Sequence, residues 1–137
     1  MKQAKTAGYS GTPLPQKLGI KPAMSVGLVG APAGFEETLG TLPPDAALVR
    51  APRKPVPLVL WFAASRKALE GNLARVSALV AQGGGLWVAW PKKTSGMPTD
   101  LTEQAIRDVL LPHGLVDYKV CAIDGTWSGL KFARRKS

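Results

Sequence analysis

Residues 83–111, GGGLWVAWPKKTSGMPTDLTEQAIRDVLL, decide the fold around which the rest of the chain is arranged. Residues 86–90 are uniformly apolar, which is typical of a strand that is covered on both faces. The sequence WPKKTSG then forms a basic loop, and Ile106, Val109 and Leu110 follow at helical spacing. The stretch therefore predicts a buried strand, a basic loop at its end, and a helix.

The start of this helix carries an N-terminal signal. Asp100 with Glu103 three positions later matches a capping box, and Thr99 or Thr102 could act as the cap instead. The helix should end before Pro112, because proline cannot continue the hydrogen-bond ladder.

Upstream residues repeat the same alternation of strand and helix. We expect a short helical turn over residues 15–18, strands over 24–29, 46–50 and 57–63, and helices over 35–39 and from Arg66 to about Ala81. Ser65 is the expected N-cap of the longer helix, and Gly83, Gly84 and Gly85 are expected to end it.

Downstream, residues 118–123 and 127–132 flank an Asp124-Gly125 turn, which is a hairpin signal. Alternating strands and helices predict an α/β fold, a single Rossmann-like domain with a mostly parallel sheet, helices on both faces and a C-terminal antiparallel hairpin. Residues 1–13 are expected to form a flexible segment, and residues 14–135 the domain.

Composition narrows the class of protein. The chain has 137 residues, of which 45% are hydrophobic and 20% charged, as in ordinary globular domains. No apolar run is long enough to cross a bilayer, and the N-terminus lacks the apolar segment of a signal peptide, so a cytoplasmic protein is expected. The net charge of +9 favours anionic ligands, acidic protein faces or nucleic acid.

The turn after the first core strand runs from Gly30 to Gly34. A glycine turn between a strand and a helix is the scaffold on which many folds bind phosphate. Here Pro32 lacks an amide donor, and Glu36 and Glu37 already complement the helix dipole. The residues favour a turn built for packing.

Two resemblances follow from these motifs. LGIKPAMSVGLVGAPAG resembles the opening of class I S-adenosylmethionine-dependent methyltransferases, which implies a shortened form of that fold. The segments KLGIKP, GAPAGFEETLG, LWVAWPKKTSG, TDLTEQAIRDVLLPHGLVDYKVCAID and TWSGLKF resemble a bacterial family catalogued as domain of unknown function 3052. That resemblance covers nearly the whole chain and implies a small cytoplasmic bacterial protein without an assigned activity.

The chain departs from the methyltransferase pattern at three places. Leu28 stands where that family has an acid, and Pro32 stands at its middle glycine. The acid that would hold the ribose hydroxyls after the second strand is replaced by Val49-Arg50-Ala51. A missing carboxylate costs a buried hydroxyl site about 1–3 kcal/mol per unmet group. Ordinary cofactor binding is therefore not expected, and no cofactor is assigned.

Other chemistry has little support in the sequence. His113 is the only histidine and lies at a helix end, where it suits a capping role. Cys121 is the only cysteine and falls within an apolar strand pattern, as a structural thiol would. No catalytic residue and no metal ligand is assigned, so whether the protein is an enzyme stays open, and a non-catalytic domain is favoured.

One place remains where a ligand would bind. In an open α/β sheet, ligands bind outside the carboxyl ends of the strands. If the first, third and fourth strands are neighbours, the glycine turn and two basic loops meet there. The candidate ligand-binding residues on these loops are Ser65, Arg66, Lys67, Lys92, Lys93, Thr94 and Ser95, with Gly30 and Gly34 in the turn.

Three functions follow for these residues. The first is a domain that binds an anionic small molecule or an acidic protein at the Lys92/Lys93 loop, and a solvated connecting loop is the structural alternative. The second is a nucleic-acid-binding protein, and the third a divergent methyltransferase. Trp87 and Trp90 point to opposite faces of their strand, so one is expected in the core and the other could stack on a ligand near the loop.

Overall fold

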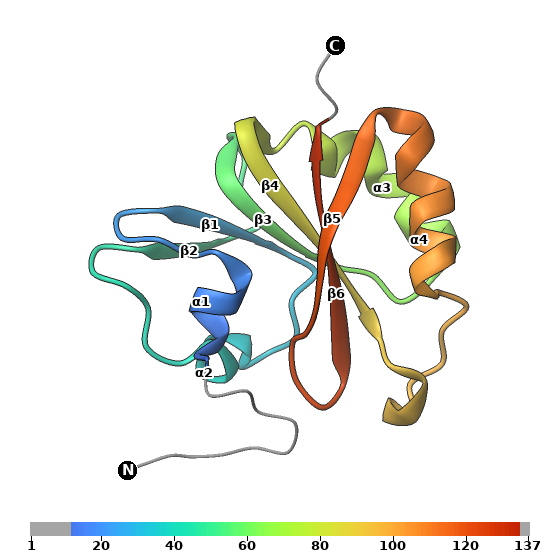
Figure 1. The fold of residues 1–137 in the computed structure, drawn as a ribbon, viewed down its shortest axis with the longest axis horizontal. Helices are drawn as coiled ribbons and strands as arrows, with labels where there is room; N and C mark the ends of the chain where they lie inside the picture. Colours follow the sequence, from blue (N-terminus) through green and yellow to red (C-terminus); the bar gives the residue numbers. More distant parts are fainter. Residues whose placement is uncertain (1–11, 135–137) are drawn as a thin grey trace.

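The computed structural model describes residues 12–134, which form one domain around a six-stranded sheet (Figure 1). The sheet has the order β2-β1-β3-β4-β6-β5. Its strands are β1 (Ser25–Val29), β2 (Ala47–Arg50), β3 (Val56–Phe62), β4 (Val80–Pro91), β5 (Leu115–Ala122) and β6 (Trp127–Arg134). The first four run parallel, and β6 pairs antiparallel with both β4 and β5. The predicted α/β architecture is confirmed.

Helices cover both faces of this sheet, as predicted. The helices are α1 (Leu14–Leu18), α2 (Phe35–Leu39), α3 (Arg66–Ser77) and α4 (Glu103–Leu110), with 3₁₀ turns η1 (Lys93–Ser95) and η2 (Leu111–His113). The buried residues of α1 and α2 share one apolar cluster, and those of α3 and α4 share the other. We call the two sides the α1–α2 face and the α3–α4 face. Among residues 12–134, no helix has the length and apolarity that a membrane span requires.

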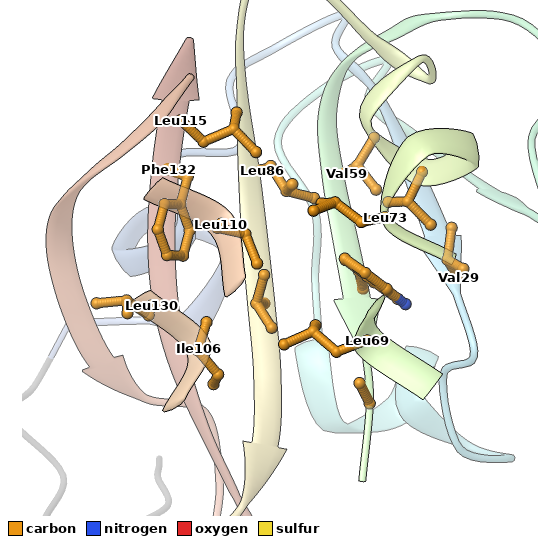
Figure 2. Close-up of a cluster of buried hydrophobic side chains, with 14 of the residues drawn as sticks. Val29, Val59, Leu69, Leu73, Leu86, Ile106, Leu110, Leu115, Leu130 and Phe132 are labelled. Atoms are coloured by element: carbon orange, nitrogen blue, oxygen red, sulfur yellow. The ribbon is translucent and has the colours of Figure 1, made fainter. Parts of the chain in front are cut away.

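The larger cluster lies on the α3–α4 face (Figure 2). Leu69 and Leu73 of α3 and Ile106 of α4 pack there with Val59 of β3 and Leu86 of β4, all 2% exposed or less. The central strands β3 and β4 also contribute side chains to the opposite cluster. Their continuous apolar runs follow from this burial on both faces.

Trp87 and Trp90 do lie on opposite faces of β4, but both are core residues. Trp87 is fully buried on the α1–α2 face, and its indole N–H donates to the Leu18 carbonyl oxygen at 2.8 Å. Trp90 is 8% exposed and belongs to the α3–α4 face. The expectation that one of them serves as a stacking platform is therefore wrong.

The boundary between α3 and β4 differs from the prediction. The helix ends at Ser77 rather than near Ala81, and the three glycines lie within β4 instead of ending the helix. Val80 pairs with Val56, yet the next pair joins Gly85 to Leu58. Residues 81–84 therefore form a bulge, which the glycines accommodate because they lack side chains.

The caps of the two long helices are well defined. Ser65 Oγ accepts a hydrogen bond from the Ala68 amide at 3.1 Å, which confirms the predicted cap of α3. Thr102 Oγ1 accepts a hydrogen bond from the Ala105 amide at 3.0 Å. The predicted alternative, Thr102, is therefore the N-cap of α4, and the prediction of a cap at Asp100 is wrong. Hydroxyl caps of this kind satisfy amides that lack partners within the helix.

No helix joins β2 to β3, and a short segment crosses β1 instead. Pro52 is buried and packs against Gly27 of β1, where an added Cβ would lie 2.7 Å from Pro52 Cγ. The absence of a side chain at Gly27 therefore lets the connection pass directly over the strand. This part of the α3–α4 face is covered by a loop.

The predicted C-terminal hairpin is confirmed, and the side chain of Asp124 stabilises its turn. Asp124 Oδ1 accepts hydrogen bonds from the amides of Thr126 and Trp127, at 2.8 and 2.9 Å. Such a bond from an aspartate to the backbone two residues later is the reason that aspartate favours turns. The turn returns β6 alongside β4, which places Trp127 opposite Pro91.

Candidate functional site

The strand order confirms that the predicted loops start from neighbouring strands. β1, β3 and β4 are adjacent and parallel, so the glycine turn, the β3–α3 loop and the loop after β4 all leave the same edge of the sheet. This edge lies at the carboxyl ends of the strands, where ligands bind in open α/β sheets.

The loop after β4 is bonded to the start of α3. Thr99 Oγ1 donates to the Ala64 carbonyl oxygen at 2.6 Å, and the Arg66 amide donates to Asp100 Oδ1 at 2.8 Å. These bonds bring the loop that carries Lys92 and Lys93 to the segment that carries Ser65 and Lys67. They also place a carboxylate at the first amide of α3, so that amide is not free for an external anion.

The seven predicted residues divide into two groups. The first group is used inside the protein: Ser65 caps α3, Arg66 pairs with Glu70 at 3.0 Å, and Ser95 Oγ bonds the Lys92 carbonyl oxygen at 2.7 Å. The second group is the three lysines at positions 67, 92 and 93, which form no ion pair within residues 12–134. The remaining residue, Thr94, is exposed and directly follows Lys93 in the loop.

The glycine turn is held by packing. Gly30 has a φ of 69°, and an added Cβ would lie 2.8 Å from the Phe62 carbonyl oxygen. Gly34 has a φ of 81° and stands at the N-cap of α2 without a side chain to accept a bond. Both positions require glycine because side chains are strained at positive φ. The structure thus assigns each of the two glycines a role in shaping the turn.

Arg50, at the end of β2, closes this turn, and the sequence did not predict its role. Its guanidinium forms a fork with the Glu36 carboxylate, with Nε–Oε2 at 2.8 Å and Nη2–Oε1 at 2.9 Å. The same group donates to the carbonyl oxygens of Ala31 and Pro32, at 3.1 and 3.0 Å. Such bidentate pairs fix geometry as well as charge.

The fork explains the acidity of Glu36. The hydrogen bonds from Arg50 hold the pKa of the Glu36 carboxyl at about 2, below its usual 4.5. A sequence signal for this contact existed, because Glu36 and Arg50 have opposite charges and follow neighbouring strands. What the sequence lacked was the register, in which Arg50 pairs with Leu28 immediately before the turn.

Aromatic side chains fill the space beneath the turn on the α1–α2 face. Phe62, the last residue of β3, makes edge contacts with Phe35 and Trp127, with ring centroids 4.8 and 5.0 Å apart. All three residues are at most 8% exposed. The edge therefore consists of a packed apolar layer below a polar fork.

The other titratable residues singled out in the sequence do not belong to these three loops. His113 is exposed in η2, directly after α4. Cys121 is partly buried on β5, and this burial raises the pKa of its thiol. No cluster of three or more histidine, cysteine or acidic side chains that could hold a metal occurs in the described part of the chain.

Comparison with known proteins supports the fold. No family model matches the chain, and no curated protein matches its sequence. The chain is similar in structure to a SAM dependent methyltransferase from Aquifex aeolicus, with 13% identity, a TM-score of 0.63 and 85% of each chain covered. A putative type 11 methyltransferase from Sulfolobus solfataricus is similar at 11% identity and a TM-score of 0.63, with 90% of each chain covered.

A fibrillarin pre-rRNA processing protein from Methanococcus jannaschii is a third similar structure, at 12% identity and a TM-score of 0.62, covering 86% of this chain and 69% of that one. These likenesses show that the chain has a Rossmann-like, methyltransferase-like fold. They agree with the fold that the resemblance of residues 18–34 implied.

Proposed function

We propose that this protein is a non-catalytic domain of methyltransferase-like fold that binds an anionic ligand or an acidic protein at its Lys92/Lys93 loop. Its membership of the bacterial family of unknown function 3052, and its place in the cytoplasm, are part of this proposal. Both parts rest on the sequence motifs alone, because no family model matches the chain.

The observation that carries the proposal is the attachment of the basic loop to the start of α3. The bonds from Thr99 to Ala64 and from Arg66 to Asp100 hold two segments together. Lys67, Lys92 and Lys93 extend from these segments without an ion pair among the described residues. Three cations without an ion pair in residues 12–134, on two segments that are bonded together, favour an anion at that surface, although the Asp100 carboxylate also lies there.

The fork at the glycine turn supports a role without S-adenosylmethionine. The methyltransferase pattern calls for a carboxylate after the second strand, and the chain has the cation Arg50 there. This cation is bound to Glu36 and to two carbonyl oxygens of the turn. Leu28, at the other acid position, is 1% exposed in the core. These residues do not fit the cofactor in the manner of that family.

The test compares two pairs of adjacent cations. Replacing both Lys92 and Lys93 with alanine should weaken binding of inorganic pyrophosphate, or of a polyglutamate peptide, at least tenfold in calorimetry. The melting temperature should change little, because Lys93 is exposed, Lys92 is only partly buried, and neither forms an ion pair among the described residues. The matched control replaces Arg53 and Lys54, two exposed cations of the β2–β3 connection, and should bind as the unaltered protein does.

The proposed site would be wrong if the variant altered at Lys92 and Lys93 bound these anions as tightly as the variant altered at Arg53 and Lys54. If duplex DNA bound instead, the nucleic-acid alternative would apply. In that case the logarithm of the affinity should fall linearly with the logarithm of the salt concentration, with a slope that counts the phosphates contacted. A weak response to salt would remove that alternative.

The fold gives a second candidate, a divergent methyltransferase. The structural neighbours named as methyltransferases cover most of the chain, and this observation favours it. Calorimetry with S-adenosylmethionine and with its demethylated product tests it directly. We expect no heat of binding from either compound, and a dissociation constant in the micromolar range would instead establish a cofactor site and overturn the non-catalytic proposal.

A further inference from the structure

A concave site lies at the opposite edge of the sheet from the Lys92/Lys93 loop. It is an open pocket of about 290 Å³ between the beginnings of β3 and β4, the segment after α1, and the terminal hairpin. Its lining comprises Gly19, Lys21, Met24, Pro57, Leu58, Ala81, Gln82, Gly83, Gly84, Gly85, Tyr118 and Lys131. The glycines that form the bulge of β4 therefore form one wall of the pocket.

Lys131 of β6 reaches this pocket because two glycines leave room for its side chain. A Cβ at Gly85 would lie 2.8 Å from Lys131 Cε, and a Cβ at Gly19 would lie 2.8 Å from its Nζ. Gly19 has a φ of 86°, which ends α1 in the left-handed conformation and turns the chain past the lysine. Backbone on both sides thus surrounds the methylene chain and the ammonium group.

The ammonium group of Lys131 has aromatic and carbonyl neighbours. Its Nζ lies 5.7 Å from the ring centroid of Trp87 and 5.6 Å from that of Tyr118. The Leu18 carbonyl oxygen lies 3.5 Å away. Ring faces attract a cation weakly, so these contacts orient the ammonium group without neutralising its charge.

A second cation shares the pocket, and no acid balances the two. Lys21 lines the same cavity, and neither lysine forms an ion pair within the described residues. Burial, together with the charge of Lys21, lowers the pKa of Lys131. Lys131 is partly buried and Lys21 is exposed at the pocket, and two like charges facing one site repel each other unless an anion binds between them.

The remaining lining limits the class of ligand. Met24, Pro57 and the ring of Tyr118 provide an apolar wall, and the Gln82 amide can donate and accept hydrogen bonds. A cavity near 300 Å³ is at the lower limit for small-molecule sites. We propose that this pocket binds a small anion with an aromatic or aliphatic body, whose charged group lies between Lys21 and Lys131.

This site is independent of the Lys92/Lys93 loop. Residues 81–85 lie near the start of β4, whereas Lys92 directly follows its end at Pro91. The two sites can therefore be separated by mutation, and the failure of one proposal leaves the other unaffected.

The experiment is an amide NMR titration of the full chain with phenyl phosphate. We expect saturable shifts centred on Gly19, Gly83 to Gly85 and Tyr118. Benzoate, which carries a carboxylate on the same ring, distinguishes the anionic group that the pocket prefers. Benzyl alcohol lacks the charge and inorganic phosphate lacks the ring, so each should bind at least tenfold more weakly than the better of the two aromatic anions.

Two variants test the lysines. Lys131→Met keeps the aliphatic chain between the glycines and removes the charge, and it should weaken binding of the preferred anion at least tenfold. Lys21→Met should also weaken binding of the preferred anion. It tests the proposal alone if Lys131→Met does not fold. Lys54→Met, an exposed lysine on another loop, is the control and should bind normally, as should the variant with alanine at 92 and 93.

The proposal is overturned if neither aromatic anion produces saturable shifts at the pocket. It is also overturned if inorganic phosphate binds as tightly as they do, or if folded Lys131→Met and Lys21→Met both bind with unchanged affinity.

Discussion

Arg50 determines the electrostatics of the glycine turn. Its guanidinium uses two nitrogens for Glu36 and shares its remaining donors between two carbonyl oxygens of the turn. Both side chains of the pair are 44% exposed, so solvent screens the attraction. The fork therefore acts mainly by fixing the shape of the turn. The lowered pKa of Glu36 is the property by which it can be measured.

The first prediction at this scale concerns pH. The folded-state pKa of Glu36 is about 2, against an ordinary value of 4.5. A depressed carboxylate pKa contributes stability that is fully present above pH 4.5 and is lost as the pH falls towards 2. Thermal unfolding should therefore show that Glu36→Gln lowers the melting temperature at pH 6, and that its difference from the unaltered protein shrinks on acidification.

Two further variants serve as controls, one compared by thermal unfolding and the other by carboxyl NMR titration of Glu36. Glu37 is exposed on the same helix without an ion pair among the described residues, so Glu37→Gln should lower the melting temperature at pH 6 less than Glu36→Gln does. In Arg50→Met, the Glu36 carboxyl should titrate close to 4.5. A Glu36 that still titrates near 2 in that variant would show that Arg50 is not the cause.

Among the elements, the connection from β2 to β3 depends on one glycine. Gly27→Ala would place a Cβ 2.7 Å from Pro52 Cγ and 3.1 Å from Val56 Cγ2. Overpacking of this kind costs about 1–3 kcal/mol of unfolding free energy. Chemical denaturation should show a loss in this range.

The matched substitution is Gly71→Ala in α3. Gly71 is exposed, and an added Cβ there meets no atom within 4 Å. Alanine is favoured over glycine within a helix, so this variant should gain about 0.5–1 kcal/mol. If both variants were stabilised, the close packing of Pro52 on Gly27 would be contradicted.

Most of the elements could be predicted from the sequence, because local signals and burial agreed. The caps at Ser65 and Thr102 and the Asp124 turn act through bonds that reach only two or three residues, so they are visible in sequence. The start of β4 was misplaced because glycines after a helical pattern resemble a terminator. Their role in a bulge depends on the pairing with β3, which is a tertiary feature.

The candidate sites show the same division between local and non-local information. The βα order predicted that the loops converge at the carboxyl edge if the first, third and fourth strands are neighbours, and the strand order confirms that condition. The contact of Arg50 with Glu36 and the cavity around Lys131 could not be predicted. Both join segments that are distant in sequence, and each requires the register of strands against one another.

At the scale of the whole molecule, the positive charge has an uneven distribution. Four of the basic residues lie outside the described residues, namely Lys2, Lys5, Arg135 and Lys136. Within the domain, α4 is joined to its neighbours by a balanced group, in which Arg107 bonds Asp117 of β5 at 2.9 Å and also bonds Glu103.

Besides the lysines at positions 67, 92 and 93, further unpaired cations among the described residues lie on and near α1 and on the terminal hairpin. Lys17, Lys21, Lys119 and Lys131 form no ion pair among residues 12–134. Lys17 and Lys119 each donate to a backbone carbonyl oxygen across the contact between α1 and β5. Among the described residues only Arg50, Arg66 and Arg107 form ion pairs, so most of the basic residues there have no acidic partner, in keeping with the net charge of +9.

The fork at the turn also limits how this chain could change by single substitutions. An acid placed at position 50 would face the Glu36 carboxylate and the carbonyl oxygens of Ala31 and Pro32, all of which now accept hydrogen bonds from Arg50. Like charges at such distances repel, and the carbonyl oxygens would lose their donor. An acid at position 50, as the methyltransferase pattern has it, would thus need a simultaneous change at Glu36, so no single substitution gives this turn that acid without repulsion.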